Sequence, residues 1–154
     1  MTDCTTCQLV DRRDAGTAPL WDAIVRTEHW DLVHSFNTSI EGWLVLVCRR
    51  HIATLAEMTD AESDEVGRLV RDVSRALHEV TGCDKTYVAQ FAESADHRHV
   101  HIHLIARHAA AGDDTRGPLV FSALGADDEH RVSDERMNEL ALAIRAELGV
   151  ATSD

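Results

Sequence analysis

Hydrophobic and polar positions along the chain follow two different periods, which predict strands in some segments and helices in others. Two early segments, His29 to Val33 and Gly42 to Cys48, are rich in apolar and β-branched side chains, as strands are. Lys85 to Ala92 and His99 to Ala106 have the same character. The short polar stretch Glu93 to Asp96 separates these last two segments, so we expect them to form an antiparallel hairpin.

The clearest helical segment begins at a capping box, in which Thr59 is followed three residues later by Glu62. Apolar side chains then recur at helical spacing, and Gly82 ends the run. These apolar positions are Val66, Leu69, Val70, Val73, Leu77 and Val80. The pattern predicts a helix over residues 59–81.

A second helix is expected over residues 133–149. Ser133 offers an N-cap, Asp134 and Glu135 favour the first turn of a helix, and Gly149 ends the apolar pattern. Residues 1–20 are polar and rich in turn formers, so we expect an irregular N-terminal arm there, and residues 112–132 look like a long loop. Because strands outnumber helices and occur in adjacent pairs, the pattern favours an α+β fold with a mostly antiparallel sheet.

Composition and charge restrict the classes of protein to which the chain can belong. Its 154 residues suit a single domain, 1–154, and its 15 Lys and Arg against 27 Asp and Glu give a net charge of −12. Such a charge argues against binding to nucleic acid or an anionic membrane. No apolar run reaches the length of a membrane span, and the first residues do not resemble a signal peptide, so we expect a cytoplasmic protein. Arginine far outnumbers lysine, which suggests a bacterial source.

Histidines are concentrated in one short segment. Of ten in the chain, five lie between His97 and His108. Within this segment His99, His101 and His103 alternate with apolar residues, so in a strand their rings project from one face, roughly 6.5–7 Å apart. Imidazole titrates near neutral pH and also binds metals. The pattern is therefore compatible with nucleophilic or acid–base catalysis, with a zinc or iron site, or with a half-exposed polar strand.

Cysteines suggest a separate metal site. Cys4 and Cys7 are spaced so that both thiolates can reach one ion, which supplies half of a tetrahedral zinc site. The alternative is that both are inert, and without an export signal we do not expect them to form a disulfide. Cys48 and Cys83 are expected to be small buried side chains, and the tryptophans Trp21, Trp30 and Trp43 to lie in the core.

The histidine segment resembles the motif of the histidine triad (HIT) superfamily of nucleotide hydrolases and transferases. His99-x-His101-x-His103 is followed by two apolar residues and then, after Ala106, by Arg107. The segment from Gly42 to Ile52 also resembles the strand that leads, in this family, into a basic pair, a His and an Ile. The resemblance covers roughly residues 4–149. It implies the HIT fold, with a five-stranded sheet and two main helices, and a homodimer.

The resemblance also implies a reaction. His101 would attack the α-phosphorus of a nucleoside polyphosphate, dinucleoside polyphosphate or adenosine phosphoramidate and form a covalent nucleotidyl-histidine. His103 would stabilise charge on the same phosphate or the leaving group, and His99 would support the strand or bind metal. The ligand would be an AMP-like purine nucleotide, contacted by Gln90 and Ser94. No organic cofactor is implied, and the structural zinc would be bound by Cys4, Cys7, His51 and His99.

Two departures from the family pattern leave alternatives open. Trp43 stands where family members usually have a histidine, and the turn before the triad, residues 93–98, lacks the usual Gly-rich sequence. One alternative is a zinc-stabilised nucleotide-binding protein with little or no catalysis. Another is a metallohydrolase whose metal is bound by the triad itself.

Overall fold

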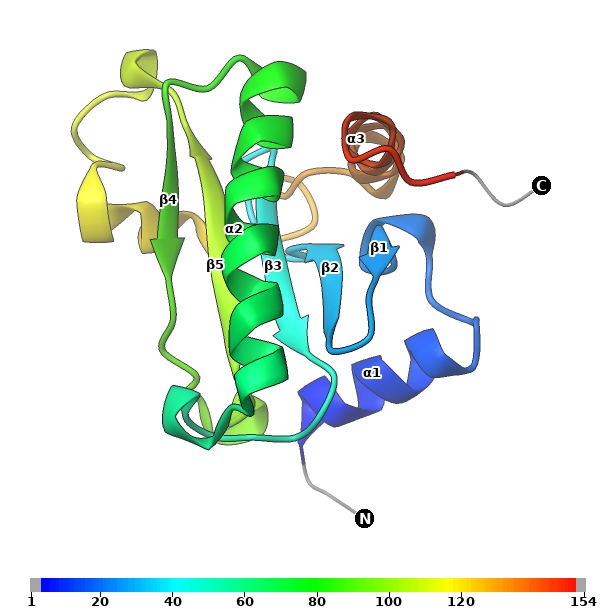
Figure 1. Ribbon diagram of the computed structural model, residues 1–154. Coiled ribbons are helices and arrows are strands. Elements are labelled where there is room, and N and C mark those ends of the chain that lie inside the picture. Colours follow the sequence, from blue (N-terminus) through cyan, green and yellow to red (C-terminus); the bar gives the residue numbers. More distant parts are fainter. Residues whose placement is uncertain (1–3, 152–154) are drawn as a thin grey trace.

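A computed structural model describes residues 4–151 and contains a five-stranded antiparallel sheet (Figure 1). The strand order is β1-β2-β3-β5-β4, and every pair of neighbours is antiparallel. The strands are β1 Val25–Arg26, β2 Trp30–His34, β3 Trp43–Cys48, β4 Lys85–Ala89 and β5 His101–Arg107. All four strands expected from the sequence are present, and the α+β fold with a five-stranded sheet is confirmed.

Helix α2, Asp60–Thr81, crosses one face of the sheet, and α3, Asp134–Glu147, lies beside it near β1 and β2 (Figure 1). The side chain of Thr59 accepts a hydrogen bond from the Glu62 backbone N–H, as the capping box predicts. At the other end, Gly82 adopts the left-handed conformation that lets a helix stop (φ 66°). Both predicted helices are therefore confirmed to within two residues.

The N-terminal arm is not irregular as expected, because Thr5–Asp14 form helix α1. The buried side of this helix mixes Thr6, Val10 and Arg13, so it shows no apolar stripe in the sequence. Tertiary contacts hold it instead. The Arg13 guanidinium pairs with Asp22 at 2.7 Å, and both side chains are buried.

The connection between β4 and β5 is also longer than expected, since it spans residues 90–100 rather than 93–96. It contains a short 3-10 helix, Ala95–His97. The segment just before β5 bonds to the end of β3: Val100 donates its N–H to the Ile52 carbonyl and accepts one from Cys48. His99 therefore lies outside the paired part of β5, although β4 and β5 do pair antiparallel as predicted.

Each face of the sheet has its own core. On the α2 face, the largest cluster includes Leu44, Leu46 and Leu104, packed against α2 and α3. On the opposite face, Trp43, Val45 and Val47 pack with residues of the segment 112–132. This segment is mostly loop, as expected, with one 3-10 helix, η5, at Gly117–Ala123. It keeps the second face partly covered.

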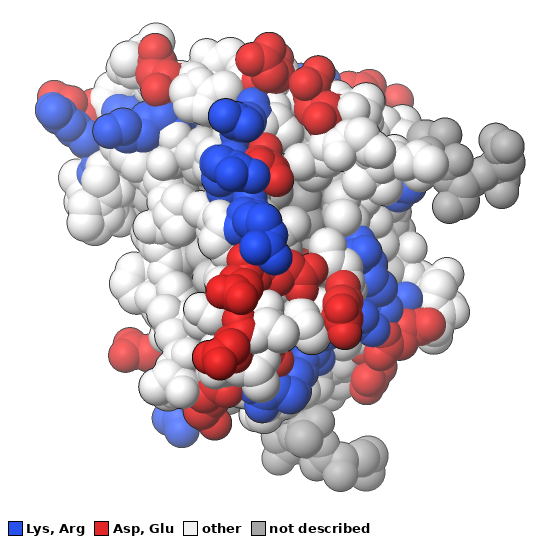
Figure 2. Space-filling model, viewed as in Figure 1, with Lys and Arg blue, Asp and Glu red and all other residues white. Residues whose placement is uncertain are grey.

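The α2 face of the molecule carries both signs of charge. Figure 2 shows Lys and Arg side chains gathered midway along α2, with Asp and Glu side chains around its first turns. Among residues 4–151, no helix is both long and apolar enough to cross a membrane.

Candidate functional site

A cavity of about 390 Å³ lies on the face of the sheet opposite α2. Two triad rings, His101 and His103, line it from β5, and they pair in register with Val47 and Val45 of β3. Other walls come from α1, from the end of β2, from the loop before β5 and from η5. Their lining residues include Thr6, Arg13, Ser35, Phe91, Ser94 and Phe121. Most of the wall surface is apolar, and α1, the end of β2 and the loop before β5 each add polar or charged side chains.

His101 is oriented by a backbone hydrogen bond. Its Nδ1 lies 2.7 Å from the His99 carbonyl oxygen, so Nδ1 carries the hydrogen and donates it. The lone pair is then on Nε2. Burial lowers the pKa of His101 below the ordinary value, which keeps the ring neutral at pH 7. A neutral imidazole with a lone pair facing a cavity is a competent nucleophile.

His103 lies beside His101, with 5.0 Å between the ring centroids. Its Nδ1 accepts a hydrogen bond of 3.0 Å from the indole N–H of Trp43. Burial, and secondly the positive charge of a protonated His101, lower the pKa of His103 to about 4. Trp43 is fully buried, as the sequence predicts, but the sequence does not reveal that it contacts the triad.

His99 belongs to a second cluster, with Cys4, Cys7 and His51. One ligand atom from each of these residues lies within 4.8 Å of the others. Nδ1 of His99 is 3.5 Å from Sγ of Cys7 and 3.8 Å from Sγ of Cys4. Nδ1 of His51 is 3.2 Å from Sγ of Cys7. The four side chains thus surround one point where α1 meets the end of β3 and the start of β5, and they could hold a metal ion.

The carbonyl oxygen of Cys48 fixes the orientation of His99. It lies 2.5 Å from Nε2, so Nε2 donates its hydrogen there and Nδ1 keeps its lone pair toward the two sulfurs. Nδ1 of His101 bonds to the backbone of the same His99. The candidate metal cluster is therefore linked to the cavity through His99, whose carbonyl oxygen accepts the hydrogen bond from the cavity-lining His101.

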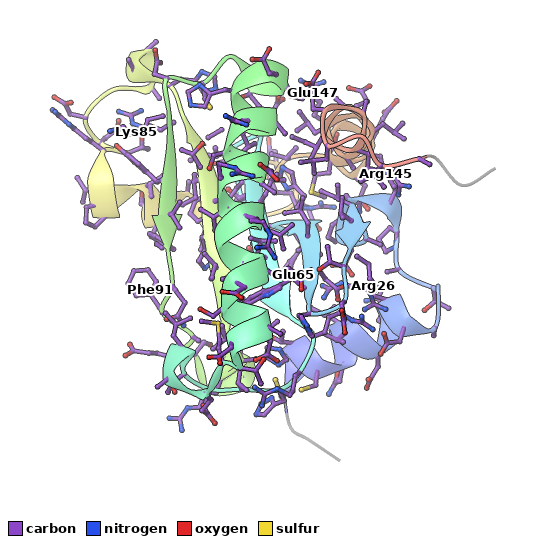
Figure 3. The ribbon with its side chains drawn as sticks, viewed as in Figure 1. Arg26, Glu65, Lys85, Phe91, Arg145 and Glu147 are labelled. Carbon is purple, nitrogen blue, oxygen red and sulfur yellow. The ribbon has the colours of Figure 1, made fainter. Side chains whose placement is uncertain are left out.

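Of the other predicted site residues, one lines the cavity and one does not. Ser94 lines the cavity, whereas Gln90, just beyond the end of β4, is not among the lining residues. Ser35 also lines it. Phe91 follows β4 and projects from the edge of the sheet (Figure 3), with its ring 5.0 Å from that of Phe121.

Helix α1 forms one wall of the cavity, which the sequence pattern does not predict. Thr6 and Arg13 line it, and the Thr6 hydroxyl lies 2.9 Å from Nδ1 of His97, in the loop before the triad strand. If residues 5–14 were predicted as a helix, Thr6 and Arg13 would be expected on one side of it. The apolar periodicity needed for that assignment is lacking, because the buried side of α1 is mixed.

The chain is similar to known proteins in structure and not in sequence. No family model matches the chain, and no curated protein matches it in sequence. Solved structures do match. A histidine triad protein from Bradyrhizobium japonicum superposes with a TM-score of 0.68 at 21% identity, covering 81% of this chain and 88% of that one.

Two further structures extend the similarity to nearly the whole chain. A zinc-bound histidine triad family protein from Mycobacterium smegmatis has a TM-score of 0.65 at 20% identity and covers 95% of each chain. A hypothetical histidine triad nucleotide-binding protein from Sulfolobus tokodaii has a TM-score of 0.69 at 14% identity, over 93% of this chain and 92% of that one. Together with the sheet order and the His-x-His-x-His segment on β5, these matches show that the chain has the fold of the histidine triad proteins.

Proposed function

We propose that the chain, as one domain over residues 1–154, is a histidine triad enzyme that transfers or hydrolyses a nucleotidyl group through His101. The observation that carries the proposal is the pair of rings at the cavity wall. His101 commits Nδ1 to the His99 carbonyl and directs a lone pair from Nε2, and His103 stands beside it. The fold shared with histidine triad proteins supports the same hypothesis.

The chemistry follows from these two side chains. Nε2 of His101 attacks the α-phosphorus, a P–N bond forms, and the bond from phosphorus to the leaving group breaks with its electron pair on the leaving group. His103 contacts the same phosphate and stabilises the charge that develops on it. Water then attacks the phosphorus, a P–O bond forms, the P–N bond breaks with its electron pair on Nε2 of His101, and the proton of the water passes to solvent. His99 supports both steps by holding Nδ1 of His101 through its carbonyl.

A nucleotide ligand suits the cavity. A volume of about 390 Å³ is in the range of small-molecule sites, and a mainly apolar lining surface with a few polar side chains is typical of them. We propose an AMP-like purine nucleotide with its phosphate at His101 and His103. Ser94, which lines the cavity, offers a hydroxyl for the phosphate, and Gln90 remains a proposed contact although it does not line the cavity.

We further propose that Cys4, Cys7, His51 and His99 bind structural zinc. Zn–S bonds of about 2.3 Å and Zn–N bonds of about 2.0 Å at a tetrahedral angle place S and N about 3.5 Å apart. The S–N distances of 3.2, 3.5 and 3.8 Å bracket that value, so the residues fit the ion. When bound, zinc would cross-link α1 to the triad segment without taking part in the reaction. The zinc-bound neighbour from Mycobacterium smegmatis supports this assignment.

A homodimer is also proposed, through the edge strand β4. One side of β4 has no partner strand within residues 4–151, and Val88 is 51% exposed on it. An apolar, unpaired strand edge is a surface that a second copy of the chain can cover. We propose that this dimer acts in the cytoplasm.

The test of the proposed function is AMP release from diadenosine polyphosphates, adenosine phosphoramidate and ADP. We expect release by the wild-type protein and none by His101→Ala, with circular dichroism showing that the variant is folded. His78→Ala is the matched control, because His78 is exposed on α2, away from the cavity. Undiminished release by His101→Ala would contradict the nucleophile assignment.

A second candidate function is nucleotide binding without catalysis. Trp43 favours it, because an indole can donate a hydrogen bond to His103 but cannot exchange protons as a histidine does. In that case AMP would raise the melting temperature while no member of the panel is turned over. A triad-bound metal is disfavoured, because within residues 4–151 the group that could hold an ion draws on His99 alone from the triad.

A further inference from the structure

Trp43 and His103 form a buried contact that fixes both rings. The indole Nε1–H of Trp43 donates to Nδ1 of His103 at 3.0 Å. Trp43 is 0% exposed and His103 8% exposed. Phe121 packs edge-on against both rings, with centroid distances of 5.2 Å to Trp43 and 5.3 Å to His103. Neither ring can turn without displacing this aromatic packing.

The strand register explains why these two side chains meet. Val45 of β3 lies opposite His103 of β5, and Trp43 is two residues before Val45 on the same face of the sheet. Large side chains at diagonal positions on neighbouring antiparallel strands reach one another. The indole therefore lies across the strand from the imidazole as a consequence of the pairing.

The indole N–H, which can only donate a hydrogen bond, selects one tautomer of the His103 ring. Indole N–H is a donor only, so the Nδ1 atom that faces it must carry a lone pair. A hydrogen on Nδ1 would place two N–H groups head to head in a buried site, and imidazolium carries a hydrogen on both nitrogens. The single hydrogen of the neutral ring is therefore on Nε2.

His101 has the opposite arrangement. Its Nδ1–H donates to the His99 carbonyl, so Nε2 keeps the lone pair. The two neighbouring rings thus offer different groups: a nucleophilic lone pair on His101 and an N–H donor on His103.

We propose that Trp43 is a positioning residue that holds His103 as a neutral Nε2–H donor, so that the leaving group departs without taking a proton from His103. The part of this proposal that concerns the leaving group rests on the proposed function. In the transfer step the P–N bond to His101 forms, the leaving group takes the electron pair, and Nε2–H of His103 donates a hydrogen bond but keeps its hydrogen. Such a site favours leaving groups that are stable as phosphate-type anions over amines, which need a proton to leave.

The surroundings of His103 support a ring that stays neutral. On its own strand the facing titratable group is His101, and burial together with that ring lowers the pKa of His103 to about 4. The rings packed directly against it are Trp43 from β3 and Phe121 from η5, neither of which titrates in this range. The other charged or titratable side chains that line the cavity are Arg13 and Asp22, which pair with each other, and His34, Glu93 and His97. Among the ion pairs found within residues 4–151, none brings a carboxylate to His103 that would favour its protonation.

Ring-nitrogen NMR of the ¹⁵N-labelled, ligand-free protein tests the tautomer directly. Loss of one set of signals in His103→Gln assigns the ring. We expect a protonated Nε2 and an unprotonated Nδ1 that do not titrate between pH 8 and pH 5. A hydrogen on Nδ1, a mixture of tautomers, or titration near the ordinary value of 6.5 in the wild-type protein would overturn the proposal.

Trp43→Phe removes the donor and retains an aromatic ring against Phe121. We expect His103 in this variant to populate both tautomers and to titrate at higher pH than in the wild type. Trp30→Phe is the control, because the Trp30 indole donates to the Glu62 carbonyl on the α2 face of the sheet, away from the triad. A His103 spectrum in Trp43→Phe identical to that of the wild type would show that the indole does not set the tautomer.

A kinetic experiment separates this proposal from the proposed function. With a dinucleoside polyphosphate, we expect kcat of Trp43→Phe to fall roughly tenfold and its pH profile to differ from that of the wild type by the added titration of His103. The wild-type preference for the polyphosphate over adenosine phosphoramidate should also shrink. A pH profile unchanged by the substitution contradicts the positioning role. If neither substrate is turned over while the NMR result holds, the proposed function fails and the tautomer assignment stands.

Discussion

His101 and His103 share a strand and a face, yet each commits Nδ1 to a different kind of partner. One partner is a carbonyl oxygen and the other is an indole N–H. A hydrogen-bond acceptor and a donor at equivalent ring positions produce opposite tautomers. The proposed difference between a nucleophilic His101 and a hydrogen-bond-donating His103 therefore arises from backbone and neighbour contacts and not from the histidines themselves.

Single-residue chemistry could be predicted only in part from the sequence. Alternation along residues 99–105 is sufficient to place the three rings on one face. The Trp43 contact joins residues sixty positions apart, and no local pattern carries that information. Only the pairing register of β3 and β5 brings the two rings together.

The charge of the Glu62 side chain stabilises the start of α2. Its buried carboxylate accepts two hydrogen bonds of 2.9 Å from Arg50 and one of 2.7 Å from the Thr59 N–H. Arg50, in the first place, lowers the pKa of Glu62 to about 2. Because this pKa is lower than in the unfolded chain, the carboxylate stabilises the fold above pH 4.5, and that contribution is lost as the pH falls toward 2.

We therefore expect Glu62→Gln to lose about 2 kcal/mol of unfolding free energy at pH 7, measured by urea denaturation. The difference from wild type should shrink as the pH is lowered below 4.5. Glu79→Gln, at an exposed position on the same helix, is the control. A deficit that stays constant from pH 7 to pH 3 would show that the charge of Glu62 is not the cause.

At the scale of elements, α1 joins the two candidate sites. Cys7 in its first turn and Cys4 at its N-cap belong to the Cys–His cluster, whereas Thr6 and Arg13 of the same helix line the cavity. Helix α2 was predictable because its cap and apolar stripe are local signals. Helix α1 was not, since buried ion pairs and the Cys–His cluster hold it from distant parts of the chain.

Arg13 is expected to be essential for the docking of α1. Its guanidinium lies 2.7 Å from Asp22 and 3.6 Å from Asp31, and all three side chains are buried. Removing the cation leaves the buried Asp22 carboxylate without its ion pair, while Asp31 keeps its pair with Arg26, so Arg13→Ala should destabilise the protein by roughly 3 kcal/mol. Arg12→Ala, at the exposed neighbouring position, should change stability little in the same thermal unfolding experiment. Equal effects of the two substitutions would refute this account of α1.

Metal removal should loosen the same helix. If zinc cross-links Cys4 and Cys7 to His51 and His99, chelation will speed hydrogen–deuterium exchange in residues 5–14 and leave α3 unchanged. Metal analysis of the purified protein before and after chelation provides the stoichiometry. Exchange in α1 that does not respond to loss of one bound zinc would contradict the proposed cross-link.

In the molecule as a whole, the sheet separates two faces of different structure. One face is covered by α2, where charges of both signs are exposed (Figure 2), and the other holds the cavity and the triad. Strand β4 forms the edge between them. Both the net charge and the strand pattern were available from the sequence, whereas the cavity depends on long-range packing of α1 and η5.

The proposed dimer through β4 predicts a difference between two surface substitutions. Val88→Glu should convert a dimer to a monomer in light scattering, because it places a charge on the unpaired strand edge. Leu142→Glu, at a similarly exposed apolar position on α3, should leave the dimer intact. A monomeric wild-type protein, or dissociation by both substitutions alike, would rule out this interface.

In the proposed reaction, His101 forms a covalent bond to the α-phosphorus of a nucleotide. Intact-protein mass spectrometry after rapid quenching under mild alkaline conditions, followed by peptide mapping, tests this bond with a diadenosine polyphosphate as substrate. We expect an adduct of one adenylyl group on His101 that is absent in His101→Ala. Substrate turnover with no adduct at any quench time, or an adduct on another residue, would contradict it.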